Sequence, residues 1–130
     1  MSAEQALFDA YREWRRLAKA AQRAISKRDW TFLFECQRTI QGIQPIISNL
    51  TREARDEWRR QEAAGHHSEA RLRAVISELA GVLESNQKLL EAYWAKALSK
   101  REKLEQAGRN LKRLQNSYVL ARSSAWASFC

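Results

Sequence analysis

The stretch of sequence that decides the fold is residues 72–118, LRAVISELAGVLESNQKLLEAYWAKALSKREKLEQAGRNLKRLQNSY. Apolar residues recur along it at alternating spacings of four and three, the pattern of one long amphipathic helix. The stripe runs through Leu72, Ile76, Leu79, Leu83, Asn86, Leu90, Tyr93, Ala97, Lys100, Leu104, Ala107, Leu111, Leu114 and Tyr118. Because no proline interrupts it, we expect a helix over residues 69–120.

Two further amphipathic segments precede this helix. In residues 3–26 the apolar stripe follows Leu7, Tyr11, Trp14, Ala18, Ala21 and Ile25. In residues 30–62 it follows Leu33, Cys36, Ile40, Ile43, Ile47, Leu50, Ala54 and Trp58. Asp29 stands directly before the second segment, where its carboxylate would cap a helix. The sequence therefore predicts two helices before the long one.

Pro45 lies inside the second segment, where proline removes a backbone hydrogen bond and kinks or breaks a helix. The apolar stripe nevertheless keeps its phase from Ile43 to Ile47. This favours a continuous helix kinked at Pro45, with two separate helices as the alternative. The next segment, AAGHHS over residues 63–68, indicates a turn with Ser68 as the N-cap of the long helix.

Together these segments predict an all-α fold in one domain over residues 1–130. We expect an elongated antiparallel three-helix bundle or coiled coil with a long C-terminal helix. The composition agrees, because the chain has only one Pro and four Gly and is rich in good helix formers. The third helix should outrun the shorter second one near residue 102. Residues 118–130 are expected to form a flexible or folded-back tail.

The apolar stripe continues into the part of the third helix that the other two helices should not cover. An uncovered apolar stripe indicates an interaction surface. The predicted partner-binding residues are Leu104, Leu111, Leu114, Tyr118, Trp126 and Phe129. Of these, Trp126 and Phe129 belong to the tail, and they either join this surface or pack on the end of the bundle. A homodimer is compatible with the same surface.

The sequence carries no motif that points to catalysis or to a bound metal. His66 and His67 are adjacent, so their side chains point in different directions, and no Cys or carboxylate cluster accompanies them. Cys36 lies on an apolar stripe, which favours a buried and inert thiol, and Cys130 has no partner at a metal-ligand spacing. We therefore expect no enzyme, no cofactor and no metal site.

The net charge of +8 is concentrated in two parts of the chain. Residues 1–28 carry a net charge of +4 and residues 65–130 carry +5, whereas residues 29–64 carry −1. Such an excess attracts acidic partners. A nucleic acid is the alternative partner, but the basic residues are dispersed around the helices and no nucleic-acid-binding motif accompanies them.

We expect a cytoplasmic protein. No apolar run approaches the roughly 20 residues that span a bilayer. The first residues, Met1 to Glu4, lack the basic-then-apolar layout of a signal peptide.

The order of the segments resembles a known family. It comprises a short first helix, a break at Arg28-Asp29-Trp30, a long second helix, a loop and a longer third helix. Two short motifs add to this: LESNQKLL over residues 83–90 and LKRLQNSY over residues 111–118. In this layout and in these motifs the chain resembles the flagellar type III export chaperones of the FlgN type, with the FliT type as a neighbour.

The resemblance implies a chaperone of type III secretion in flagellar biogenesis, located in the bacterial cytoplasm. Such a chaperone keeps a secreted subunit of the hook–filament junction or the filament cap export-competent and presents it to a component of the export gate. The family binds its cargo through the end of the last helix, here from about Leu104. Pro45, the basic charge and the aromatic tail depart from the family pattern. A coiled-coil stalk or adaptor of the export apparatus is an alternative, although two long helices without a short first one would then be expected.

Overall fold

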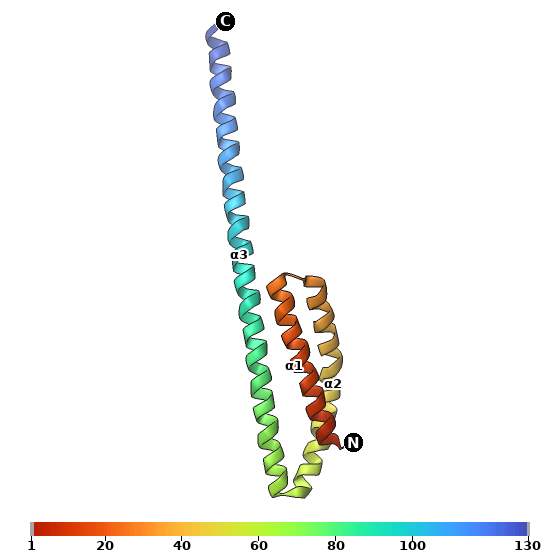
Figure 1. The fold of residues 1–130 in the computed structure, drawn as a ribbon. Coiled ribbons are helices and arrows are strands. Elements are labelled where there is room, and N and C mark those ends of the chain that lie inside the picture. The colour runs from red at the N-terminus through yellow and green to blue at the C-terminus, as the bar shows by residue number, and fades with distance from the viewer. Residues whose placement is uncertain (1, 130) are drawn as a thin grey trace. The chain divides into compact units, whose positions relative to one another are not determined.

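The computed structural model describes the backbone of residues 2–129 and the side chains of residues 2–117. All secondary structure in this part of the chain is helical, which confirms the all-α prediction (Figure 1). The helices are α1 (Ala3–Lys27), α2 (Trp30–Gln61) and α3 (Ala63–Phe129). The chain divides into two compact units, Met1–Leu90 and Glu91–Cys130, where the sequence led us to expect one domain.

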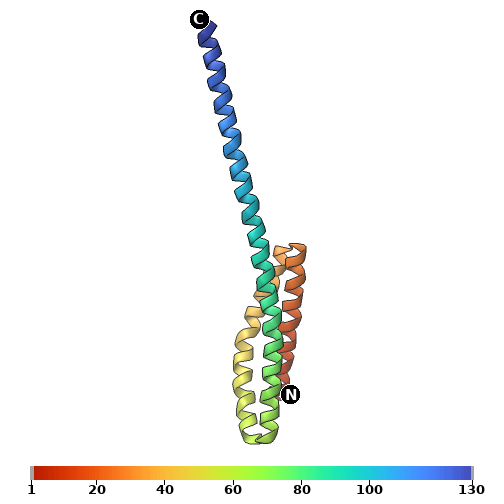
Figure 2. The same cartoon turned by 90° about the vertical axis from the view of Figure 1, so that its left-hand side faces the viewer.

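The first unit is a three-helix bundle of α1, α2 and the first part of α3 (Figures 1 and 2). The guanidinium of Arg71 lies 4.2 Å from the ring centre of Phe8. Farther along both helices, the side chain of Asn86 reaches the backbone of Ala18, so α1 and α3 run in the same direction. Since α2 connects their opposite ends, it runs antiparallel to both.

Apolar side chains from all three helices form the core of this bundle. The main cluster consists of Leu7, Phe8, Tyr11 and Ala18 from α1, Ile47, Ala54 and Trp58 from α2, and Leu72 and Leu79 from α3. Burial of Tyr11 raises the pKa of its hydroxyl, and the nearby charge of Arg55 and a hydrogen bond with Thr51 oppose this only in part. Most of these residues belong to the apolar stripes of the sequence, which therefore face one another as the periodicity predicts.

Local capping explains where the first two helices meet. Arg28 ends α1 in the left-handed conformation, with φ 59°. Asp29 then caps α2, because its side chain accepts a hydrogen bond of 3.1 Å from the amide of Phe32. The turn thus needs only two residues between the helices.

Pro45 lies inside α2, which continues from Trp30 to Gln61 without a break. The side chain of Pro45 is exposed on the surface of the bundle. Proline inside a helix removes one backbone hydrogen bond, and at this exposed position its ring takes no place in the core. The apolar stripe therefore keeps its phase, and Ile47 is buried two residues later.

The predicted turn over residues 63–68 is wrong, because α3 already begins at Ala63. The reversal is made by Glu62 alone, which has φ 50° and ψ −107°, an unfavourable conformation for a residue with a side chain. Ser68, which was expected to cap the helix, lies within α3 instead, and its side chain is buried. At its other end α3 continues to Phe129, past the expected end near residue 120 and through the expected tail.

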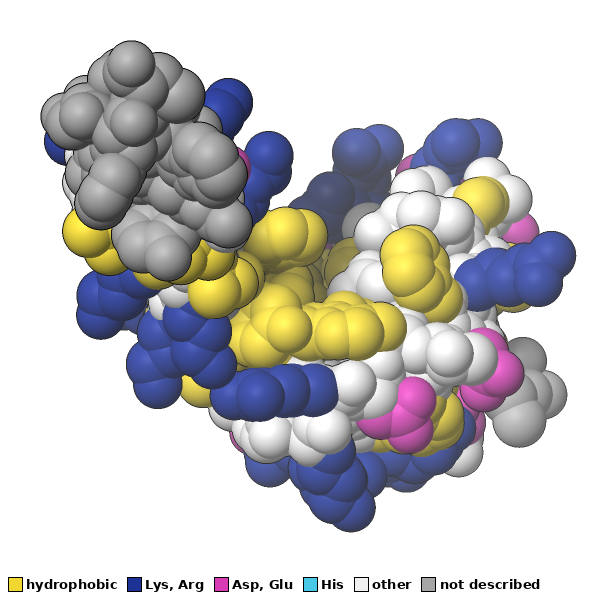
Figure 3. Space-filling model, turned by 90° about the horizontal axis from the view of Figure 1, so that it is seen from above, with side chains coloured by type: hydrophobic (Ala, Val, Ile, Leu, Met, Phe, Trp, Pro, Cys, Tyr) yellow, Lys and Arg dark blue, Asp and Glu magenta, His cyan; other side chains and the backbone are white. Residues whose placement is uncertain are grey.

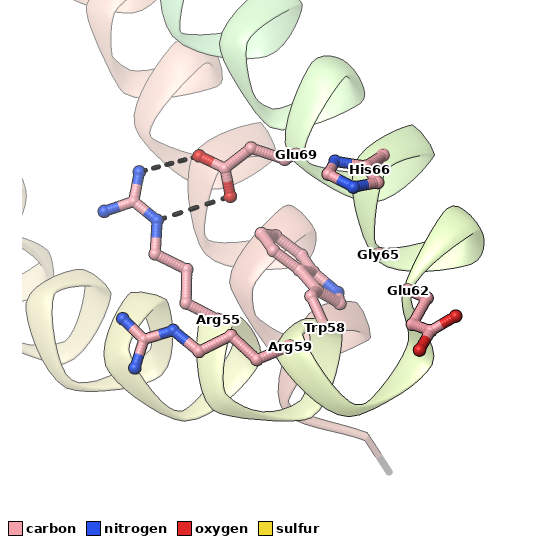
Figure 4. A pocket seen from close by; sticks show the side chains of 7 residues that line it. All are labelled: Arg55, Trp58, Arg59, Glu62, Gly65, His66 and Glu69. Atoms are coloured by element: carbon pink, nitrogen blue, oxygen red, sulfur yellow. Dashed lines mark hydrogen bonds and ion pairs between the residues drawn. The ribbon is translucent and has the colours of Figure 1, made fainter.

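Gly65 explains why a turn motif occurs inside a helix. A Cβ atom at this position would overlap the backbone carbonyl of Trp58, so α2 and α3 approach each other more closely than any other residue would allow. Figure 4 shows the same hairpin, where Arg55 of α2 pairs with Glu69 of α3 at 3.0 Å. The glycine therefore serves the contact between two helices.

The first prediction compares Gly65 with Gly81. Gly65→Ala should lower the free energy of unfolding by more than 1 kcal/mol, because the methyl group forces the two backbones apart. Gly81→Ala should raise it by about 0.5–1 kcal/mol, since a Cβ there meets nothing within 4 Å and alanine favours helix. Urea denaturation followed by circular dichroism measures both. Equal stabilisation by the two substitutions would contradict the close approach at Gly65.

Candidate partner-binding surface

Side chains at every seventh position of α3 lie in one row, and three neighbouring rows face the bundle in the first unit. We label them g, a and d, in the usual heptad notation. Row g holds Val75, Val82 and Leu89; row a holds Ile76, Leu83 and Leu90; row d holds Leu72, Leu79 and Asn86. Row d is buried, and rows a and g are partly buried or at the edge of the exposed class. This wide apolar face packs against two helices, α1 and α2.

Asn86 is the polar member of the buried row. Its side-chain nitrogen donates a hydrogen bond of 2.8 Å to the carbonyl oxygen of Ala18 in α1. Its side-chain oxygen is buried and has no hydrogen-bond partner among the described residues. One hydrogen bond contributes about 1 kcal/mol, and an unsatisfied buried acceptor costs about 1–3 kcal/mol. Asn86 therefore does not add stability on balance, and it fixes the register of α3 on α1, the role expected of a polar core residue.

In the second unit, rows a and d continue on α3, which is the only helix among the residues of this unit that the structure describes. We call the described part of these two rows the C-terminal seam: Tyr93, Ala97, Lys100, Leu104, Ala107, Leu111 and Leu114. All three leucines of the seam are strongly exposed. The exposed fractions are 73% for Leu104, 58% for Leu111 and 68% for Leu114. Such a contiguous apolar row on a helix indicates a binding surface.

The structure thus brings three of the six predicted partner-binding residues together. Leu104 and Leu111 share row a, and Leu114 lies one turn beyond Leu111 in row d. The side chains of the other three, Tyr118, Trp126 and Phe129, lie outside the residues whose side chains the structure describes. Their part in the surface stays a prediction.

Two exposed apolar residues near the seam were not predicted as binding residues. Trp94 and Leu98 are both exposed, and they lie one helical turn apart beside row a. The indole of Trp94 meets the ring of Tyr93 edge-on, with ring centres 6.4 Å apart. Trp94 and Leu98 are four residues apart, and this spacing in the sequence could have shown that they lie on one side of the helix. Single exposed apolar residues are common, however, and carry little information alone.

The side chains that suggested other chemistry do not form a site. His66 and His67 are exposed, and the described residues contain no group of three or more His, Cys, Asp or Glu that could hold a metal ion. Cys36 is buried beside Ala20 and Ala21, as its place on the stripe predicts, and burial raises the pKa of its thiol. A thiol in this state is a poor nucleophile.

The open hollow in Figure 4 lies at the α2–α3 hairpin and is lined by Arg55, Trp58, Arg59, Glu62, Gly65, His66 and Glu69. Two ion pairs involve three of its four charged side chains: Arg55 pairs with Glu69, and Arg59 pairs with Asp56 at 3.6 Å. The side chain of Trp58 belongs to the core. The hollow therefore reflects how the hairpin is held together, and the C-terminal seam remains the better candidate for a functional surface.

Comparisons with protein-family models, with curated proteins and with solved structures found no match. None of the helices in the described residues has an apolar stretch long enough to cross a membrane. Function must therefore be argued from the surface itself.

The second prediction separates core leucines from seam leucines. Leu72→Ala combined with Leu79→Ala should lower the free energy of unfolding by about 2–5 kcal/mol per site, because both side chains are buried. Leu111→Ala combined with Leu114→Ala should change it by less than about 0.5 kcal/mol per site, since exposed positions contribute little. Urea denaturation of the full chain measures both. A comparable loss in the two variants would show that the seam is covered in the free protein.

Proposed function

We propose that this protein binds a helical segment of a partner protein along the C-terminal seam. The observation that carries the proposal is the exposed set of Leu104, Leu111 and Leu114 on a unit whose described residues contain no second helix. An amphipathic helix in a groove or on a helix face is a common mode of peptide recognition, and it uses anchors at this spacing. The first part of the same helix belongs to the bundle of the first unit, so α3 contributes both to the folded core and to the proposed binding surface.

The three exposed leucines of the seam can supply a large part of the energy that specific binding needs. Burying one leucine completely is worth about 1.5–3 kcal/mol, so covering all three contributes up to about 9 kcal/mol before the cost of association. Micromolar binding corresponds to about 8 kcal/mol. The three leucines therefore account for much of a micromolar affinity, and additional contacts are needed to offset the cost of association.

Within this role we propose a cytoplasmic export chaperone of a bacterial flagellum. The support is the resemblance of the helix order and of residues 83–90 and 111–118 to the FlgN-type chaperones, together with the exposed seam. Its partner is then a secreted helical subunit of the hook–filament junction or the filament cap. Chaperone and partner form a coiled coil along α3, which explains why the heptad pattern of α3 continues beyond the three-helix bundle.

The third prediction tests this function by co-expression. The tagged full-length protein, produced with each junction and cap subunit encoded in the same genome, should keep one of these subunits soluble and co-purify with it. Leu111→Ala combined with Leu114→Ala should weaken the complex by at least about tenfold, since each tenfold step needs only 1.4 kcal/mol. Titration of purified components by isothermal calorimetry gives the affinities.

The matched control is Leu98→Ala, which removes a leucine of the same helix that is 54% exposed and lies in row b, outside the seam. It should leave the affinity within about twofold of the wild type. If none of the subunits binds, the export-chaperone role is wrong. If nucleic acid alone is recovered, with an affinity that falls steeply with salt, the nucleic-acid alternative is supported instead.

A further inference from the structure

The composition of row g changes at the boundary between the two units. In the first unit this row is apolar, with Val75, Val82 and Leu89; in the second unit its first two members are Lys96 and Lys103. The apolar face of α3 is therefore three rows wide where it packs against two helices, and two rows wide in the C-terminal seam. A seam restricted to rows a and d is the geometry with which one helix packs against a single other helix.

The rows that flank the seam carry only basic or uncharged side chains. Row g has Lys96, Lys103, Asn110 and Ser117, and row e, on the other side, has Trp94, Arg101, Gly108 and Gln115. Lys100 adds a further positive charge inside row d. Three of these cations, Lys96, Lys100 and Lys103, form no ion pair among the described residues, and Arg101 is paired only with Glu105 at 3.1 Å. That pair is exposed and therefore weak.

The acidic residues of the same segment lie elsewhere on the helix. Between residues 91 and 117 these are Glu91, Glu102 and Glu105, all in rows b and f, which point away from the seam. Figure 3 shows one face of the molecule, on which Lys and Arg side chains, in dark blue, take up more of the surface than Asp and Glu side chains, in magenta. Charges in rows e and g contact the partner in a coiled coil and select it.

This arrangement disfavours a second copy of the chain as the occupant of the seam. In a parallel pair, row g of one helix faces row e of the other, which sets Lys96 against Arg101, and Lys100 faces its own counterpart. In an antiparallel pair, row e of one helix faces row e of the other and row g faces row g, so no Lys or Arg of these rows meets an acidic residue. In either pairing, the basic flanks of the described segment find no acidic residue opposite them on a second copy.

We propose that the occupant of the C-terminal seam is a single amphipathic helix of a different protein, with Asp or Glu in the rows that flank its apolar stripe. This inference rests on the proposed function and adds the chemistry of the partner to it. The leucines supply the affinity, while Lys96, Lys103 and Arg101 choose among amphipathic helices by charge. Lys100 extends the same preference, because its amine can reach an acidic flank while its aliphatic stem lies along the seam.

The fourth prediction uses two synthetic helical peptides, about four heptads long, with the same apolar residues in rows a and d. One carries Glu at every e and g position, and the other carries Lys. The full-length protein should bind the Glu peptide at least about tenfold more tightly than the Lys peptide at low salt, and added salt should reduce the difference. Fluorescence anisotropy of labelled peptides measures both affinities.

Two triple variants with the same change in net charge locate the effect. Lys96→Glu, Arg101→Glu and Lys103→Glu together should reverse the preference, so that the Lys peptide binds more tightly. Arg109→Glu, Lys112→Glu and Arg113→Glu lie in rows f, b and c, so together they should preserve the preference for the Glu peptide. An equal effect of both variants would overturn the inference, because only net charge would then matter.

Other outcomes separate this inference from the proposed function. If the wild-type protein binds neither peptide, or binds both equally, the preference for an acidic partner is wrong. The proposed binding of a secreted subunit is not contradicted by that result. A stable dimer in analytical ultracentrifugation that Leu111→Ala and Leu114→Ala dissociate also overturns the inference, in favour of a second copy. If those two substitutions leave binding of the Glu peptide unchanged, the seam itself is not the binding surface, and the proposed function fails.

Discussion

The hydrogen bond from Asn86 to the carbonyl of Ala18 fixes how α3 lies on α1, and the rest of the arrangement depends on it. A slip of α3 by one turn would bring Leu83 or Leu90 to this carbonyl, and neither can donate a hydrogen bond. The leucines of row d would pack in several registers, since apolar contacts are not directional. A single polar residue whose oxygen has no partner thus selects one register at the expense of stability.

The width of the apolar face on α3 differs between its two parts. Up to Leu90 the helix presents three apolar rows and is packed by α1 and α2. From Glu91 onward it presents only two, flanked by Lys96, Arg101 and Lys103. One uninterrupted helix can therefore carry both the stability of the bundle and a surface for a partner. Helical segments without tertiary packing are marginally stable in water, so a partner would also order the second part.

The helices and the core could be predicted from the sequence because the apolar spacing of four and three is itself the geometry of a packed helix. The start of α3 could not be predicted, because glycine is typical of turns. The reason for Gly65 is its close approach to the backbone carbonyl of Trp58, which only the structure shows. Leu104, Leu111 and Leu114 could be found from the expected helix lengths. The importance of Lys96 and Lys103 could not, because it depends on which rows of α3 are buried in the bundle.

Near residue 90, α3 changes from a helix packed by two others to one whose apolar residues are exposed. Hydrogen–deuterium exchange of the free full-length protein, followed by mass spectrometry, tests it directly. Amides of residues 72–90 should exchange only when the whole bundle unfolds. Amides of residues 91–117 should exchange at least about 100-fold faster, because local opening of the helix is enough to expose them. Equally slow exchange in both segments would contradict the account, because the C-terminal seam would then already be covered.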